Sequence, residues 1–244
     1  MRPSGLALRF VFVSGQEVGE TMPRDDAESV AYKAYSLGEH RADVAAHIVG
    51  VACGLVGTFV LMLKASAGAP LLLVGAALYA VGLLAMFGFS AAYHFWPRSP
   101  VKELLRRLDH AAIFVMIAGT ITPFVMNRVG GAWGFSLLVF VWLVAVAGIT
   151  MKLVFPRRWE FVTIFLYVGL GLSILILGDR LFNAIAPSSL MLLVAGSVTY
   201  ILGIVFHLWE RLPYQNAIWH WLVLAAAVLH YTAVLNEVAA AASM

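Results

Sequence analysis

The chain has 244 residues, of which 62% are apolar and only 12% charged, and its formal net charge is +3. A soluble domain is about half apolar and about a quarter charged, so this composition excludes a soluble protein and indicates an integral membrane protein. The slight excess of Lys and Arg is expected beside anionic lipid headgroups and does not indicate a nucleic-acid partner. The single Cys53 excludes a framework of intrachain disulfides.

Residues 1–38 are predicted to be a flexible cytoplasmic tail, because they mix charged residues with Gly, Pro and Ser. The opening stretch MRPSGLALRFVFVSG is a poor signal peptide, since Arg9 interrupts its apolar run and no clear cleavage site follows. Translation could also begin at Met22, because nothing before it is needed for the predicted fold. The membrane domain is predicted to cover 39–244.

Seven apolar segments follow, each long enough for a helix that rises ~1.5 Å per residue to cross ~30 Å of hydrocarbon. The sequence therefore predicts an all-α bundle of seven transmembrane helices. A further segment, SPVKELLRRL, predicts a separate short helix on the headgroups, with Ser99 as its cap and Pro100 at its first position. The predicted spans are 43–63, 71–95, 109–126, 133–154, 160–178, 189–207 and 217–236.

The distribution of Lys and Arg predicts the orientation of the bundle. Thirteen of them precede the first or seventh segment or lie in the connections 96–108 and 152–159, all on one side of the membrane. Only Lys64, Arg128 and Arg180 lie on the other side. Because basic residues are retained in the cytoplasm, we expect the N-terminus inside and the C-terminus outside.

Polar and ionisable residues are concentrated at the cytoplasmic ends of four predicted helices, where their cost in a membrane calls for a structural or chemical purpose. Singly, each has an ordinary explanation: a His can bond at the interface, Ser90 can bond the Met86 carbonyl, and Asp43 can be a favourable first-turn charge. As a set from several helices at one depth, they favour a shared site. Four-residue steps place several of them on common helix faces. The residues are Glu39, Asp43 and His47; Ser90 and His94; Asp109 and His110; and Asn216 and His220.

Neutral imidazoles with a carboxylate are the ligand set of a catalytic zinc that keeps one position open for water. The same residue types could form a Ser-His-Asp nucleophilic triad. Ser90 has neither a strained turn nor a glycine-rich oxyanion loop beside it, so the zinc site is the stronger hypothesis.

Four motifs, in order, resemble the hemolysin III family, bacterial relatives of the progestin and adipoQ receptors within a wider group that includes alkaline ceramidases. The likeness runs from Glu39 to Glu237. Two positions depart from the usual pattern: Asp43 stands where the family usually has Asn, and Asn216 where it typically has His. The motifs are E-x-x-x-D-x-x-x-H-x-x-G from Glu39, SAAYHF from Ser90, LDHAAIFVMIAGTITPF from Leu108 and LPYQNAIWHWLVLAAAVLH from Leu212.

The resemblance implies a multi-pass protein of the cell membrane, expected to be the bacterial inner membrane, with zinc near the cytoplasmic face. His94 and His220 are the implied metal ligands. Asp109 is the implied catalytic residue that holds or activates the water, with Ser90 beside it.

Asn216 leaves the third zinc ligand open, because an amide is a poor ligand. Asp109 could enter the ligand set, His47 could contribute, or the affinity could be lower. His47 and Asn216 are thus candidates to bind the metal or to orient its ligands. His230, ~15 Å further along the last helix than His220, is expected to be a packing or relay residue.

Two functions remain open at this point. The first is a zinc-dependent hydrolase of a membrane lipid amide or ester, such as a ceramide-like or acyl-amide lipid. The second is a receptor-like or membrane-homeostasis protein in which zinc is structural. The family label also suggests cytolysis, but seven obligate spans argue against a pore-former that is soluble before insertion. A channel or transporter has no support from broken helices or mid-membrane charge pairs.

Overall fold

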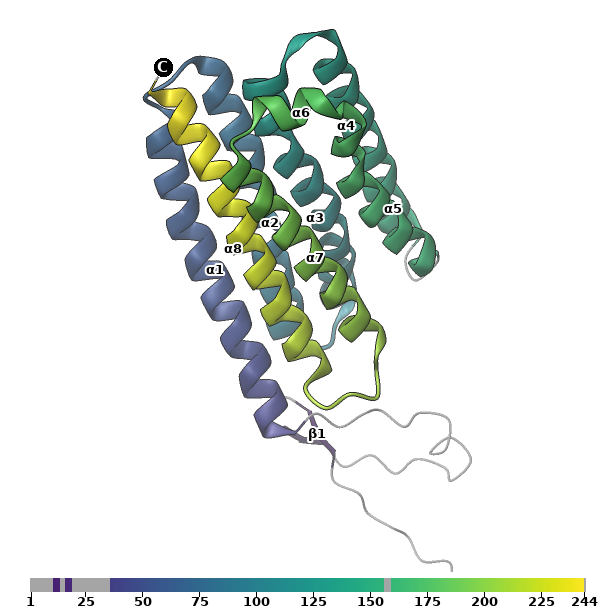
Figure 1. The fold of residues 1–244 in the computed structure, drawn as a ribbon. Helices are drawn as coiled ribbons and strands as arrows, with labels where there is room; N and C mark the ends of the chain where they lie inside the picture. The colour runs from purple at the N-terminus through teal and green to yellow at the C-terminus, as the bar shows by residue number, and fades with distance from the viewer. Residues whose placement is uncertain (1–10, 14–15, 19–35, 156–158, 244) are drawn as a thin grey trace, which may run out of the picture.

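The computed structural model describes residues 11–13, 16–18, 36–155 and 159–243, and long helices dominate it (Figure 1). Strands β1 and β2 form an antiparallel pair within the predicted tail. Met22, the alternative start that the sequence suggested, lies outside the described residues. Two helical segments have other pitches: η1 is a π-helix and η2 a 3₁₀-helix. The elements are β1 Val11–Val13, β2 Gln16–Val18, α1 Leu37–Ala65, α2 Pro70–Phe95, α3 Pro100–Phe124, η1 Val125–Val129, α4 Gly131–Val154, α5 Glu160–Leu172, η2 Ser173–Leu177, α6 Asp179–Ala184, α7 Pro187–Leu208 and α8 Gln215–Ala242.

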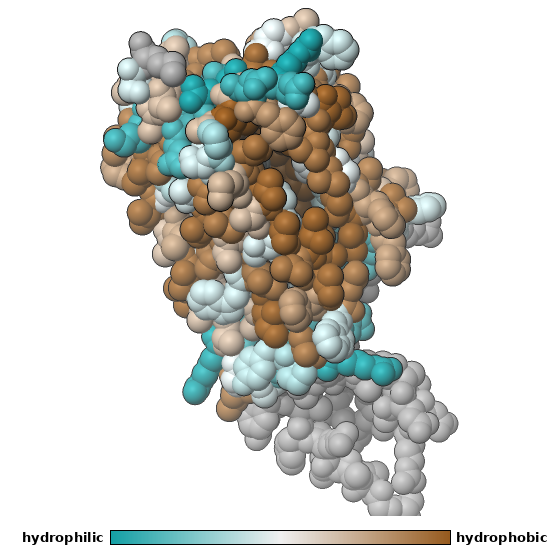
Figure 2. All heavy atoms as spheres, viewed as in Figure 1, coloured by the Kyte–Doolittle hydropathy of each residue, from teal (hydrophilic) through white to brown (hydrophobic). Residues whose placement is uncertain are grey.

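Seven helical segments of the described chain are long and apolar enough to cross a membrane, which confirms the predicted seven-helix bundle and a multi-pass membrane protein. Figure 2 shows the corresponding surface, a broad hydrophobic belt with hydrophilic residues gathered toward its two ends. Large apolar side chains such as Phe59, Phe140 and Phe165 are exposed on the outside of the bundle. In water they would be unfavourable, but against lipid chains they match the solvent.

The predicted separate headgroup helix at 99–108 is wrong, because these residues form the first turns of α3. Ser99 and Pro100 do begin the helix as expected, and the Ser99 hydroxyl accepts a hydrogen bond from the Lys102 amide at 3.3 Å. Beyond them, residues 101–108 contain good helix formers and no Gly or Pro that would end the helix. The helix therefore continues directly from the headgroup region into the bundle.

α3 is the most buried of the seven spans and packs extensively against α2 and α4. Two glycines let the α2 and α3 backbones approach closely. A Cβ atom on Gly82 would lie 2.9 Å from Met116 Cα, and one on Gly119 would lie 2.8 Å from the Leu78 carbonyl oxygen. Such close backbone contact is how helices associate in lipid, where burial of apolar surface gives little driving force.

The first and last membrane helices lie side by side, with the start of α1 next to the start of α8 (Figure 1). The end of the bundle where α1, α3 and α8 begin and α2 ends is called the site end below. The Glu39 carboxylate accepts hydrogen bonds there from the Ser36 amide at 2.8 Å and the Tyr214 amide at 2.7 Å. It thus caps α1 and fixes the residue just before α8 at the same time.

Candidate metal centre

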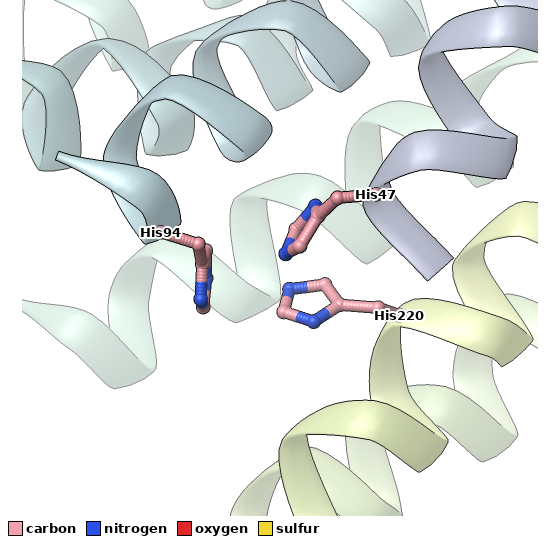
Figure 3. Close-up of side chains that lie close together, drawn as sticks. All are labelled: His47, His94 and His220. Carbon is pink, nitrogen blue, oxygen red and sulfur yellow. The ribbon is translucent and has the colours of Figure 1, made fainter. Parts of the chain in front are cut away.

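Three histidines from three helices converge at the site end: His47 of α1, His94 of α2 and His220 of α8. Figure 3 shows their rings turned toward one another. One ring nitrogen from each lies within 4.8 Å of the others, and the ring centroids are 4.3 to 4.6 Å apart. His47 is buried and the other two are half-buried. These three side chains could hold a metal ion.

The Asp43 carboxylate contacts all three histidines. Its Oδ1 is 2.6 Å from His220 Nδ1, and its Oδ2 is 3.2 Å from His94 Nδ1 and 3.8 Å from His47 Nε2. An ionised carboxylate can only accept, so Nδ1 of His94 and of His220 must carry the proton and donate it. Nε2 of each ring then keeps its lone pair, which is the form that binds a metal.

The residues present fit a metal ion. Nε2 of His47 is buried and has no hydrogen-bond partner among the described residues. An isolated buried polar nitrogen is unfavourable, whereas a ligand nitrogen would be satisfied by a metal. The edge of the Phe95 ring packs against the same imidazole, with centroids 5.6 Å apart, and helps to hold its orientation.

The placement of these groups follows from helical spacing on α1. Glu39, Asp43 and His47 are one turn apart, so they share the face that packs against α8. Glu39 holds the Tyr214 amide, Asp43 holds His220, and His47 points into the cluster. The Trp221 indole also donates to the Ala42 carbonyl at 3.2 Å. These contacts fix how far α1 and α8 can slide along each other.

The two residues predicted to be catalytic flank the histidine cluster. Ser90 lies one turn before His94 on α2 and is half-buried, and its hydroxyl makes no hydrogen bond within the described part of the chain. Asp109, on α3, is 3.5 Å from His110 Nδ1, and its carboxylate interacts electrostatically with His94 and His220. Asp109 does not belong to the three-histidine group, and the nearest carboxylate to that group is Asp43.

The remaining candidates have different positions. Asn216 is half-buried in the first turn of α8, one turn before His220. His230 lies away from the cluster, between α7 and α8, where Nε2 is 3.1 Å from the Leu193 carbonyl oxygen and the ring packs on Tyr200. That environment is typical of a packing residue. His110 Nδ1 bonds the Arg106 carbonyl at 2.8 Å.

Asp43 was included in the predicted polar set at the helix ends, but sequence reasoning gave it no role beside the metal ligands. Its four-residue spacing from His47 was the available signal, because the spacing puts both side chains on one helix face. Of the two explanations weighed for Asp43, a favourable first-turn charge and membership of a shared site, the structure supports the second, since its carboxylate bonds His220 of the last helix.

Comparison with known proteins places the chain among related membrane proteins. Residues 36–231 match the family described as Haemolysin-III related. The chain is 31% identical to the Hemolysin-3 homolog of Bacillus subtilis over 82% of its own length and 95% of that protein. It is 32% identical to Hemolysin-3 of Bacillus cereus, over 84% and 94% of the two chains. Similarity extends to the human monocyte to macrophage differentiation factor, at 29% identity over 64% of this chain and 67% of that one. The chain therefore belongs to the hemolysin III family, which is related to the progestin and adipoQ receptors.

Proposed function

We propose that His47, His94 and His220 bind zinc and that the protein is a zinc-dependent hydrolase of a membrane lipid amide or ester. The observation that carries the proposal is the convergence of three imidazoles on one point, with the buried Nε2 of His47 unpartnered beside them. Three protein nitrogens leave a fourth position for water, as in catalytic zinc sites. A structural zinc usually has four protein ligands.

Zinc, when bound, supplies a Lewis acid that polarises a carbonyl and activates water. The protein residues would do the rest. Asp109 is proposed to accept the proton of the attacking water and to pass it to the departing nitrogen or oxygen, as a general acid–base. Ser90 is proposed to donate a hydrogen bond to the carbonyl oxygen as it becomes negative. The carbon–nitrogen or carbon–oxygen bond then breaks, which releases a fatty acid and an amine or alcohol.

Asp43 has a positioning role in this scheme. By accepting from Nδ1 of both His94 and His220, it sets the tautomer and the orientation of two ligands at once. Its negative charge also increases the basicity of the imidazoles and offsets the charge of a bound cation.

The substrate is proposed to be a membrane lipid with an acyl-amide or ester bond near its headgroup, for example a ceramide-like lipid. The support is positional. The cluster lies within the first three turns of α1, the first two turns of α8 and the last turn of α2, which supports a site close to the headgroups. A carbonyl at the junction of headgroup and acyl chain would reach this depth without leaving the bilayer.

A second candidate is a receptor-like or membrane-homeostasis protein in which zinc only joins helices. The observation in its favour is that the cluster links α1, α2 and α8, with Asp43 close to all three imidazoles. The cytolytic activity implied by the family name has no separate support in the site.

Metal analysis and lipid turnover together test the hydrolase. We expect detergent-purified protein to contain about one zinc per chain, and His94→Ala to contain little. Wild-type protein should release fatty acid from at least one lipid in a panel of ceramides, acyl amides and esters, and the metal-stripped protein should not. Zinc without turnover across the panel would contradict the hydrolase and leave the structural role.

We also propose that the site end faces the cytoplasm, because the basic connections of the chain lie there. An alkaline phosphatase fused to the C-terminus is expected to be active, since it needs an extracytoplasmic environment. Green fluorescent protein fused after the connection 96–108 should fluoresce. The reverse pattern would place the candidate metal site in the outer leaflet.

A further inference from the structure

An apolar groove runs along the lipid-facing surface at the opposite end of the bundle. It has a volume of about 470 Å³ and lies between the start of α4, η2 and α6. A second hollow of about 390 Å³ adjoins it and shares Trp133 and Arg180 with it. The apolar groove is lined by Trp133, Ser136, Leu137, Phe140, Ile176, Leu177 and Arg180.

Arg180 gives this groove one charged end. Its guanidinium lies 5.2 Å from the centroid of the Trp133 ring, a cation–π contact that holds it over the groove. No acidic side chain forms an ion pair with Arg180 among the described residues, and neither hollow has an Asp or Glu in its lining. Arg128, which lines the second hollow, is instead paired with Glu237. Of the two arginines that line the hollows, Arg180 is therefore the one without an ion pair, and the exposed Asp179 that precedes it lies outside both linings.

The charged end and the apolar part of the groove lie at the levels of a lipid's headgroup and of its acyl chains, respectively. Arg180 is in the short helix that follows the fifth span, so it lies at headgroup level. Phe140 is nine residues after Gly131, the first residue of α4, and is exposed, so it lies about 13 Å along the helix from its start, toward the acyl chains. Trp133 is at the boundary, where indole rings are favoured.

We propose that this groove binds a phospholipid with a net negative headgroup, whose phosphate contacts Arg180 and whose acyl chain lies along Leu137, Phe140 and Ile176. Guanidinium and phosphate form paired, charge-assisted hydrogen bonds. A zwitterionic lipid fits less well, because the lining offers no carboxylate to its ammonium group. Free phosphate would leave the apolar part of the groove without a role. The proposal is independent of the zinc site.

Native mass spectrometry of the full chain tests the proposal after release from nanodiscs containing equal amounts of phosphatidylglycerol and phosphatidylcholine with identical acyl chains. Wild-type protein should retain phosphatidylglycerol preferentially, and Arg180→Gln should reduce that retention by about fivefold, the effect of one basic residue at an anionic surface. Ile176→Asn should reduce retention of both lipids. Lys64→Gln, which removes another cation of the same end outside the groove, should behave as wild type.

Equal retention by the Arg180→Gln and Lys64→Gln variants would overturn the proposal, as would equal binding of the two lipids by the wild type. Displacement of phosphatidylglycerol by millimolar inorganic phosphate alone would also overturn it, because it would indicate a simple anion site. The Tm in detergent should be the same in all variants, which checks that each one folds.

Discussion

Replacing Asp43 with Asn is expected to weaken zinc binding by about 10- to 100-fold, the usual cost of losing a group that orients metal ligands. The Asp43 carboxylate accepts from Nδ1 of both His94 and His220. An Asn side chain has one acceptor oxygen, and its amide NH₂ would face the other N–H as a second donor. One imidazole would then lose its partner, and with it a fixed orientation. Competition with a chromogenic chelator measures the change in Kd.

Asn216, the second position that departs from the family pattern, offers a way to restore zinc binding in the Asp43→Asn variant. Asn216→His is expected to tighten zinc binding in the wild-type background, because it adds an imidazole one turn before His220. In the Asp43→Asn background it should restore most of the lost affinity. Asp179→Asn, which removes an exposed carboxylate at the opposite end, is the matched control and should leave the Kd unchanged. An unaltered Kd in Asp43→Asn would show that Asp43 does not support the ligands.

Replacing Asp109 with Asn is expected to lower lipid hydrolysis by about a hundredfold or more, the contribution of a general base. Asn is nearly the same shape, and Asp109 lies outside the three-histidine group, so zinc content and thermal melting should stay near those of the wild type. The measurements are fatty-acid release, zinc content and Tm in detergent, on the same preparation.

The two candidate functions give opposite results for Asp109→Asn. If zinc only joins helices, Asp109 would bind the metal or orient its ligands, so Asp109→Asn should lower metal content and Tm together, and no variant should turn over lipid. Loss of metal and early melting in Asp109→Asn would therefore contradict the hydrolase. Loss of turnover with zinc retained would contradict the purely structural role.

The membrane spans could be predicted well from the sequence, because about 20 apolar residues in a row have few alternatives to a transmembrane helix. The structure of residues 99–108 could not be predicted in the same way. The basic and apolar residues of this segment suit a headgroup helix as well as the first turns of a span, and only the absence of a break before Ala111 favours the second. Hydropathy locates the apolar part of a helix and does not show where the helix begins.

The candidate site could be predicted only in part. The histidines of α2 and α8 were identified from their resemblance to family motifs, and helix ends at a common depth brought the first helix into consideration. Whether His47 or Asp109 would complete the group depends on the rotation of α1 and α3 about their axes. That rotation is set by packing, such as the close contact at Gly82, and by the bonds of Glu39 and Asp43 to α8. The spacing of residues within one helix carries no information about this rotation.

The pairing of α1 with α8 has a consequence for biosynthesis. His47 and Asp43 are in the first membrane helix to be synthesised, whereas His220 is in the last. Until α8 emerges from the ribosome and docks, His47 has one histidine of the group available, on α2, and Asp43 lacks its shortest hydrogen bond. Tight metal uptake must therefore wait for the complete chain, and a protein truncated within α7 should be inserted but metal-poor. Metal loading would in this way report that the whole bundle has assembled.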